Sequence, residues 1–153
     1  MVDVTIKLAS IDDLDATAAL FDLYRQFYGQ PENVELAKSF IKNRMTMQQS
    51  SILLGINSVG HAVGFCQLYP SFCSVIAQPI FVLYDLFVVP EARKLGVGKL
   101  LLLDAERLAS EHRMARMDLT TAKDNKAAQS VYESLGWVRD EIFYTYNRNI
   151  VSS

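Results

Sequence analysis

The chain has 153 residues, a length that suits one domain, and we expect a single domain over residues 1–153. Half of the residues are hydrophobic and 21% are charged, the balance of a globular protein with enough apolar material for a core. The formal net charge of −2 and the lack of a basic charge run argue against a nucleic-acid-binding protein. Two cysteines and two histidines show no zinc-ligand spacing, so no metal site is expected.

The apolar runs of the chain are short. Pro79–Leu83 and Leu100–Leu103 are the longest, and neither is long enough to cross a bilayer. The N-terminal residues do not show the basic segment and apolar run of a signal peptide. We therefore expect a cytoplasmic protein without a membrane partner.

The N-terminal part predicts one strand and two helices. Val4–Leu8 alternates between apolar and polar residues, which indicates a half-buried strand. Ser10 and Asp13 resemble a capping box, and the helix that follows carries an apolar stripe as far as Tyr28. A second amphipathic helix is expected over Asn33–Met47.

The middle of the chain reads as three strands. Ser51–Ile56 and Ala62–Tyr69 are strand-like runs separated by a hairpin signal at Asn57–Gly60. Pro79–Val89 is nearly all apolar and predicts a central strand that is buried on both faces.

Helices and strands alternate in the C-terminal part. A helix is expected from about Gly96 to His112 and a strand over Arg116–Thr121. Asp124 or Asn125 can cap one more helix. The last two expected strands are Trp137–Arg139 and Ile142–Asn147. This order predicts a mixed α/β architecture.

The strongest chemical signal is the segment Arg93–Lys99, between the central strand and the following helix. The first N–H groups of a helix lack partners, and the helix dipole adds positive charge there. Gly96 and Gly98 have no side chains, so phosphate oxygens can approach the backbone amides. Arg93, Lys94 and Lys99 add positive charge. The segment predicts a diphosphate site, and the alternative is an ordinary turn with surface cations.

Two other phosphate motifs fit this segment less well. A nucleotide P-loop needs a hydroxyl residue after its lysine, but Leu100 follows Lys99. A dinucleotide fingerprint needs a third glycine where the chain has Leu101. Asp118 does stand at the spacing of that fingerprint's acidic residue, yet Gly96 lies too far beyond the strand for its tight turn.

The pattern Arg93-x-x-Gly96-x-Gly98, after the strand Tyr84–Pro90, resembles the pyrophosphate motif of the GNAT superfamily of N-acetyltransferases. A second motif of that superfamily is similar to the downstream set Asn125, Ala128, Tyr132 and Gly136-Trp137. Two motifs in this order are more specific than either alone. The resemblance implies a GNAT-like α/β fold with a mixed central sheet of about six or seven strands and helices on both faces.

The resemblance also implies acetyl-CoA as co-substrate. The pantetheine arm would pair with the backbone of Leu86 and Val88, and the loop amides would bind the pyrophosphate. The implied cofactor-binding residues are Leu86, Phe87, Val88, Arg93, Lys94, Leu95, Gly96, Val97, Gly98, Lys99, Asn125, Ala128 and Tyr132. The amine would attack the thioester directly, which agrees with the lack of a cysteine–histidine pair.

Two residues are candidates for catalysis. By the resemblance, Tyr132 would donate a proton to the departing thiolate, for which a phenol is a suitable acid. Its place on the apolar stripe of its helix leaves core packing as the alternative. Many relatives carry a glutamate where this chain has Tyr84, so the base is open. Asp85 is a candidate, beside a purely structural carboxylate or an ordered water.

Substrate contacts are expected from aromatic residues. Tyr28, Tyr69 and Tyr84 are the main candidates. Further candidates for the pocket wall are Tyr24, Phe27, Glu32, Phe72 and Tyr144. Such a wall of aromatic rings and carboxylates would favour a cationic amine.

The sequence thus predicts an acetyl-CoA-dependent N-acetyltransferase that acts on a primary amine of a small molecule or a protein. The alternative is a non-catalytic acyl-CoA-binding regulatory module. Relatives of this size often pair through strands, which makes Ile142–Asn147 a candidate for contacts in a homodimer.

Overall fold

The computed structural model of the protein describes residues 3–151. These residues form two compact units, residues 3–120 and residues 121–151, which we describe separately. The first two and last two residues of the expected single domain lie outside the described residues. Within residues 3–151, no helix has the length and hydrophobicity needed to cross a membrane.

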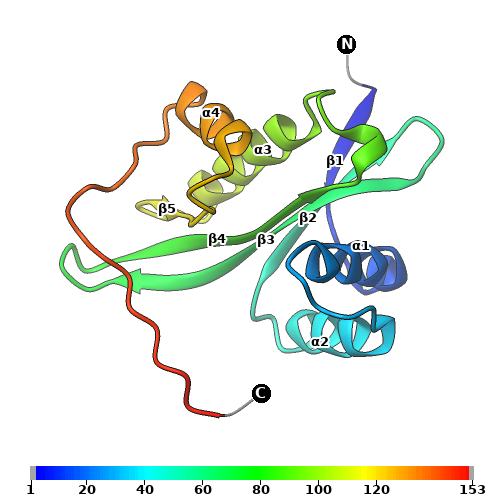
Figure 1. Cartoon of the computed structure of the whole chain (residues 1–153), viewed down its shortest axis with the longest axis horizontal. Coiled ribbons are helices and arrows are strands. Elements are labelled where there is room, and N and C mark those ends of the chain that lie inside the picture. Colours follow the sequence, from blue (N-terminus) through cyan, green and yellow to red (C-terminus); the bar gives the residue numbers. More distant parts are fainter. Residues whose placement is uncertain (1–2, 152–153) are drawn as a thin grey trace. The chain divides into compact units, whose positions relative to one another are not determined.

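The first unit is built on a sheet that contains both antiparallel and parallel pairs. Its strands are β1 (Val4–Leu8), β2 (Ser51–Asn57), β3 (Ala62–Cys73), β4 (Gln78–Val88) and β5 (Met117–Asp118). They lie in the order β1-β2-β3-β4-β5, and only the pair β4–β5 is parallel (Figure 1). The expected mixed sheet is confirmed.

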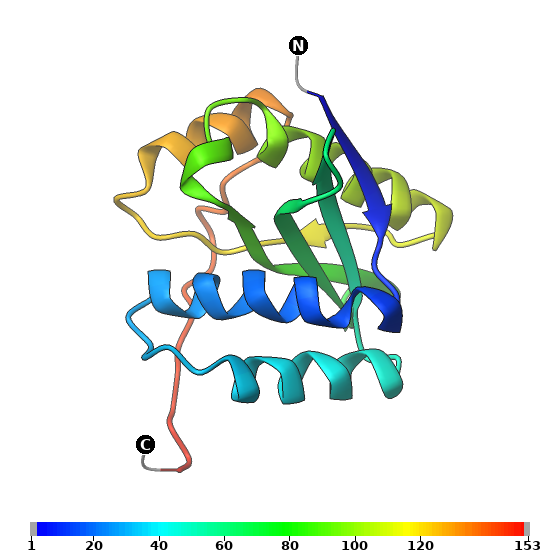
Figure 2. The same cartoon turned by 90° about the vertical axis from the view of Figure 1, so that its right-hand side faces the viewer.

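Helices cover both faces of this sheet, as expected. They are α1 (Leu14–Phe27), α2 (Val34–Thr46) and α3 (Val97–Glu111), with 3₁₀ turns η1 (Ile11–Asp13) and η2 (Pro90–Ala92). Figure 2 shows α1 and α2 side by side on one face, with α3 on the other. The Asp13 carboxylate accepts from the Ser10 N–H at 2.9 Å, and the Asn33 side chain accepts from the Leu36 N–H at 3.1 Å. These caps fix both helix starts.

The core of the first unit is apolar on both faces of the sheet. Phe21, Ile41 and Phe65 are buried between the sheet and the α1–α2 pair. On the other face, the start of α3 packs closely over the paired glycines Gly55 and Gly64. A methyl group would lie 3.2 Å from Val97 Cγ1 at Gly55 and 3.3 Å from it at Gly64. Because Gly55 and Gly64 have no side chains, α3 can pack close to the sheet at this point.

The second unit contains α4 (Lys126–Ser134). The Asn125 side chain caps it by accepting from the Ala128 N–H at 3.3 Å. Gly136 follows the helix with a φ of 92°, the left-handed conformation in which helices often end. The predicted cap of this helix is confirmed, with Asn125 as the capping residue.

The predictions at the C-terminus and for the last strand of the sheet were partly wrong. Trp137–Arg139 and Ile142–Asn147 do not form strands, because within the described residues no neighbouring strand pairs with them. Arg116–Thr121 contains only the short β5, which is Met117–Asp118. The sheet of residues 3–151 therefore has five strands, fewer than the six or seven expected.

Candidate active site

β4 has an open edge in its second half. β5 pairs with β4 only at Phe81 and Val82. From there to Val88, no strand of the described part of the chain lies on this side of β4. β4 and β5 therefore run apart beyond Val82. An unpaired edge presents backbone donors and acceptors to a ligand.

The alternation of the strand decides which groups face the open edge. The Val89 N–H donates to the Val63 carbonyl at 2.9 Å, on the β3 side. Neighbouring residues of an antiparallel strand point their backbone groups in opposite directions. The backbone groups of Val88 and Leu86 therefore point away from β3, as pairing with a pantetheine arm requires.

A β-bulge lies where the open edge begins. Gln67 is opposite Asp85 and Leu68 is opposite Leu83, so Tyr84 is an extra residue in β4. The Tyr84 side chain is 68% exposed, whereas Asp85 is only 4% exposed. The bulge thus turns Tyr84 outward and leaves Asp85 facing inward.

The other end of the open edge leads into the start of α3. Gly96 caps the helix with a φ of 86°, and Lys94 also has a positive φ, of 64°. The Leu100 N–H bonds the Gly96 carbonyl at 3.1 Å. The amides of Val97, Gly98 and Lys99 precede it and form the donor-rich end of the helix.

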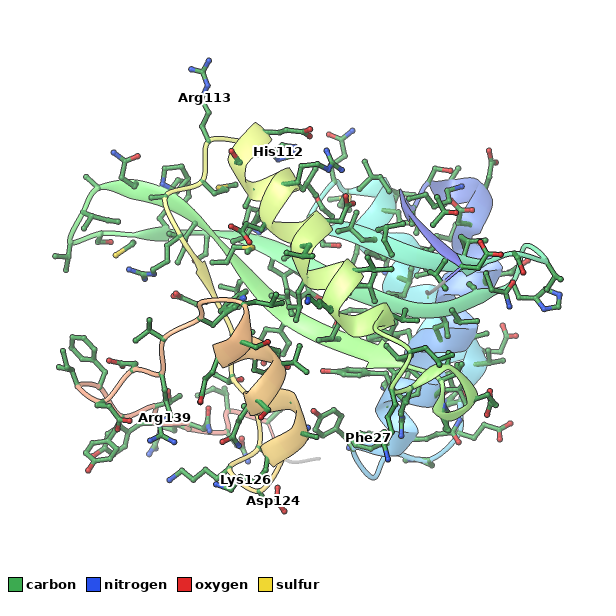
Figure 3. The ribbon with its side chains drawn as sticks, turned by 90° about the horizontal axis from the view of Figure 1, so that it is seen from above. Phe27, His112, Arg113, Asp124, Lys126 and Arg139 are labelled. Atoms are coloured by element: carbon green, nitrogen blue, oxygen red, sulfur yellow. The ribbon has the colours of Figure 1, made fainter. Side chains whose placement is uncertain are left out.

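Arg93 holds this loop against β4. Its Nε donates to the Val88 carbonyl at 2.8 Å. Its guanidinium carbon lies 5.5 Å from the ring centre of Phe27 and 5.4 Å from that of Phe87. Phe27 lies at the end of α1 (Figure 3). The Arg93 side chain therefore orders the loop through contacts within the protein.

Asp85 belongs to a chain of hydrogen bonds inside the first unit. The Gln67 Nε2 donates to the Asp85 carboxylate at 2.5 Å, and the Ser50 hydroxyl donates to Gln67 Oε1 at 2.7 Å. Gln67 is fully buried. The Tyr24 hydroxyl donates to the Tyr84 carbonyl at 3.4 Å and lies close enough to the Asp85 carboxylate for each group to shift the pKa of the other. Four polar side chains thus connect α1, β3 and β4.

Burial raises the pKa values of the ionisable groups in and around this hydrogen-bonded network. Burial raises the pKa of Asp85, although the Gln67 hydrogen bond and the neighbouring Tyr24 act in the opposite direction. Burial and the nearby Asp85 charge raise the pKa of Tyr24 well above its ordinary value. The same two causes raise the pKa of Tyr69 to about 12. The carboxyl is therefore a better proton acceptor than an exposed aspartate.

The structure brings the three main substrate candidates together around Tyr24. The ring centres of Tyr69 and Tyr84 are 5.7 Å apart, and those of Tyr24 and Tyr28 are 5.1 Å apart, both edge to face. Tyr28 and Tyr84 each influence the pKa of Tyr24. These two ring pairs are joined by the hydrogen bond from the Tyr24 hydroxyl to the Tyr84 carbonyl.

The sequence analysis missed two polar residues of this site. Gln67 and Ser50 were not named, although a glutamine inside an otherwise apolar strand was a usable signal. Three further candidates for the pocket wall have exposed side chains. Glu32 is exposed between α1 and α2, Phe72 is 78% exposed near the end of β3, and Tyr144 is 89% exposed in the second unit.

The sequence profile of the acetyltransferase (GNAT) family matches residues 17–137. The chain belongs to this family. The match spans both units of the structure and contains both motifs named above. A single domain over residues 1–153 stays a prediction.

Similar proteins agree with membership in the GNAT family. The uncharacterized N-acetyltransferase YhfO of Bacillus subtilis is 39% identical over 147 residues, which cover 96% of this chain and 98% of YhfO. A crystal structure of a probable acetyltransferase is 37% identical, with a TM-score of 0.91 over 97% of this chain and 99% of that one. The structure of AAC(6')-Iy with the bisubstrate analogue CoA-S-monomethyl-acetylneamine shares the fold at 19% identity, with a TM-score of 0.79 over 95% of this chain and 98% of that one.

The second GNAT motif lies in the second unit. Tyr132 is half-buried, and its ring centre is 6.2 Å from that of Trp137. Asp124 and Lys126 flank the start of α4 (Figure 3). Asn125 caps this helix through Ala128, so its side-chain oxygen has a structural function. The roles of Tyr132, Asn125 and Ala128 toward a cofactor stay predictions.

A surface cavity of about 560 Å³ lies beside the loop between β4 and α3, with Val89, Leu95 and Val97 in its lining. Its lining includes Asp3, His61 and Glu91, and does not include Tyr84 or Asp85. Among the described residues, no group of three or more His, Cys, Asp or Glu side chains is arranged to hold a metal ion.

Proposed function

We propose that this GNAT protein transfers the acetyl group of acetyl-CoA to a primary amine by direct attack of the amine on the thioester. The observation that carries the proposal is the open edge of β4, which runs from the bulge at Tyr84 to the start of α3. The end at the bulge has aromatic side chains, with the carboxyl group of Asp85 buried beside them. The other end offers backbone amides for a diphosphate.

Acetyl-CoA would lie along this edge. The amides from Lys94 to Lys99, including those of Leu95, Gly96, Val97 and Gly98, would bind the pyrophosphate, while Arg93 orders the loop. The pantetheine arm would pair with Leu86 and Val88 on either side of Phe87, which places the thioester near the bulge. From the second unit, Asn125, Ala128 and Tyr132 complete the proposed cofactor-binding set.

The chemistry needs one base and one acid. The acceptor ammonium loses a proton to the base, the amine nitrogen bonds the acetyl carbon, and the carbon–sulfur bond breaks. We assign the base to Asp85, whose raised pKa favours proton uptake. As the amide forms, the nitrogen loses its second proton. Tyr132 gives its proton to the CoA thiolate and is reprotonated by the proton that leaves the nitrogen. The net products are the acetylated amine, CoA and one proton, which Asp85 releases to solvent.

The acceptor would bind against Tyr28, Tyr69 and Tyr84. These rings form an aromatic wall, and the nearby Asp85 is buried rather than lining it. The rings favour a small molecule or a protein side chain that presents a primary amine beside an apolar group. A cation on a ring face gains roughly 1 kcal/mol.

A non-catalytic acyl-CoA-binding module is the second candidate. The observation that favours it is Tyr84 in the place of the usual glutamate. A panel of polyamines, amino acids, aminoglycosides and peptides separates the two candidates when CoA thiol release is followed together with acetyl-CoA calorimetry. Thiol release with one amine class supports the transferase. Tight acetyl-CoA binding without release supports the module, and no binding at all contradicts both.

Two further proposals concern the context of the reaction. We place it in the cytoplasm, on the sequence argument given above. We also propose a homodimer that forms through the C-terminal segment Ile142–Asn147, whose apolar side chains are exposed in the single chain. The exposed fractions are 81% for Ile142 and 80% for Phe143.

A further inference from the structure

Asp85 is too deep in the first unit to take a proton from an acceptor directly. Only 4% of the residue is exposed, its carboxylate already accepts a hydrogen bond from Gln67, and the neighbouring Tyr24 affects its pKa. Proton transfer requires a hydrogen bond, or a single bridging group, between acceptor and base. A group that reaches both Asp85 and the bulge must therefore connect them.

Tyr24 is placed to be that group. Its hydroxyl donates to the Tyr84 carbonyl at 3.4 Å, in the bulge beside the proposed position of the thioester, and the neighbouring Asp85 carboxylate affects its pKa. The ring of Tyr24 is fixed by edge contacts with Tyr28 at 5.1 Å and Phe65 at 5.8 Å. A fixed hydroxyl can accept one proton while it gives up another.

We propose that Tyr24 and Asp85 form a proton relay for the acceptor amine, with Gln67 and Ser50 as positioning residues. The inference rests on the proposed acetyl transfer. The ammonium proton passes to the Tyr24 oxygen as the Tyr24 hydroxyl proton passes to the Asp85 carboxylate. Tyr24 stays neutral throughout, and the neutral amine then attacks the thioester. Asp85 later returns its proton to solvent through Tyr24.

The concerted transfer fits the electrostatics of the site. Burial and the Asp85 charge raise the pKa of Tyr24, so a free tyrosinate is costly and the two protons must move together. Burial raises the pKa of Asp85, which makes the carboxylate the natural end of the relay.

Gln67 and Ser50 keep the carboxylate in position. Gln67 is fully buried and donates to Asp85, and Ser50 fixes the Gln67 amide by donating to its oxygen. The Gln67 hydrogen bond also lowers the pKa of Asp85 against the effect of burial. Loss of Gln67 should therefore move the acid limb of the pH–rate profile to higher pH.

The neighbouring titratable groups do not provide another path for the proton that Tyr24 and Asp85 transfer. Besides the relay, the nearby titratable or charged groups are Tyr28 just after α1, Arg44 of α2, Cys66 and Tyr69 of β3, and Tyr84 of β4. Burial raises the pKa of Cys66 and that of Tyr69, each to about 12, so both stay neutral near pH 7. Arg44 is a permanent cation, with its guanidinium carbon 4.4 Å from the ring centre of Phe40.

The test measures kcat/KM for the best acceptor of the amine panel from about pH 6 to about pH 10, the range in which an alkylamine loses its proton. Tyr24→Phe and Asp85→Asn should each lower kcat/KM at pH 7 by at least about tenfold. The deficit should shrink to about twofold near the pKa of the amine, because a neutral amine needs no relay. The double variant should be no worse than either single variant, since the two residues act as a unit.

Thr17→Val is the matched control. Thr17 lies on the same helix, is fully buried and donates to the Asp13 carbonyl at 2.8 Å, away from the relay. Its loss should leave the pH profile unchanged. A Tyr24→Phe enzyme with the wild-type profile overturns the relay alone, as does a deficit that is equal at all pH values. A wild-type chain without turnover overturns the proposed function as well. If Tyr24→Phe does not fold, the relay is tested with two other variants. Asp85→Asn should show the pH-dependent deficit, and Gln67→Leu should move the acid limb of the pH–rate profile to higher pH; the absence of both effects overturns the relay.

Discussion

Two buried aspartates of the first unit illustrate how partners decide the role of a side chain. Asp22 is 5% exposed and accepts from the Gln26 side chain and from the Asn33 backbone N–H, both at 3.0 Å. These bonds hold the turn between α1 and α2. Asp85 is equally buried but lies beside Tyr24, which can itself pass a proton. Asp22 therefore serves the fold, whereas Asp85 is the residue suited to chemistry.

Asp85 should reduce the stability of the fold at neutral pH. A carboxyl whose pKa is raised on folding stabilises the fold while protonated, and this contribution is lost as the pH rises through the raised pKa. Asparagine cannot ionise and keeps an acceptor for Gln67. We expect Asp85→Asn to raise the melting temperature at pH 8 by about 2–4 °C, the shift that ~1 kcal/mol produces in a chain of this size.

Thermal unfolding followed across pH checks this expectation. The gain should disappear toward pH 4, near the ordinary pKa of an aspartate. Asp118→Asn is the control, because Asp118 is an exposed partner of Arg116 and its neutralisation should bring no gain. If Asp85→Asn melts at a lower temperature than the wild type at pH 8, the ionised carboxylate of Asp85 stabilises the fold and the expectation is wrong.

Tyr132 gives a second prediction at the scale of a residue. If its phenol protonates the thiolate, Tyr132→Phe should lower kcat by at least about tenfold with acetyl-CoA affinity nearly unchanged. If the ring only packs against Trp137, phenylalanine should preserve both quantities. Steady-state kinetics and calorimetry on the same preparation distinguish these outcomes.

At the scale of elements, local signals predicted most of the fold. The capping box at Ser10 and the cap at Asn125 both stand where the sequence indicated, because each depends on a few neighbouring residues. Ile142–Asn147 has the composition of a strand but forms none, because a strand also needs a partner that its own sequence does not specify.

The candidate site was predictable to a different extent. The glycines after β4 are visible in the sequence because a loop motif is contiguous. The chain from Ser50 through Gln67 to Asp85 is not, because its members come from separate positions and meet only through strand register. The bulge that turns Tyr84 outward is also a property of the pairing of two strands.

The start of α3 can be tested with two variants of equal size. Asparagine and aspartate both tolerate the positive φ of Gly96, so they differ mainly in charge. We expect Gly96→Asp to weaken acetyl-CoA binding at least about fivefold more than Gly96→Asn, because ~1 kcal/mol of repulsion from the diphosphate is added. Calorimetry with acetyl-CoA measures the difference, and equal affinities would remove the diphosphate from this loop.

The packing of α3 on the sheet gives a further prediction. Gly55→Ala should cost about 1–3 kcal/mol of stability and weaken acetyl-CoA binding, since its methyl would press on Val97. Val97→Ala should recover part of that loss in the double variant. Gly64→Ala should not be rescued in this way, because its methyl would also lie 3.1 Å from the Phe87 backbone carbonyl. Equal rescue of both glycine variants would contradict the packing argument.

At the scale of the whole molecule, the C-terminal residues differ from the rest of the chain. Tyr144 and Tyr146 are 89% and 90% exposed, and Ile142 and Phe143 beside them are exposed to a similar extent. Side chains of this kind in one continuous segment are unfavourable in water. The strand-like composition of the segment makes a second copy of the chain a suitable partner, because edge pairing would satisfy its backbone and cover its side chains.

The mass of the protein in solution tests this arrangement. A dimer has close to twice the chain mass of 17.2 kDa. We expect the double variant Phe143→Ser and Tyr146→Ser to sediment as a monomer, because it loses apolar area that pairing would bury. Ile150→Ser is the matched control, since Ile150 is 87% exposed but lies outside Ile142–Asn147, and it should remain a dimer. A wild-type chain that sediments as a monomer at micromolar concentration would exclude pairing through this segment.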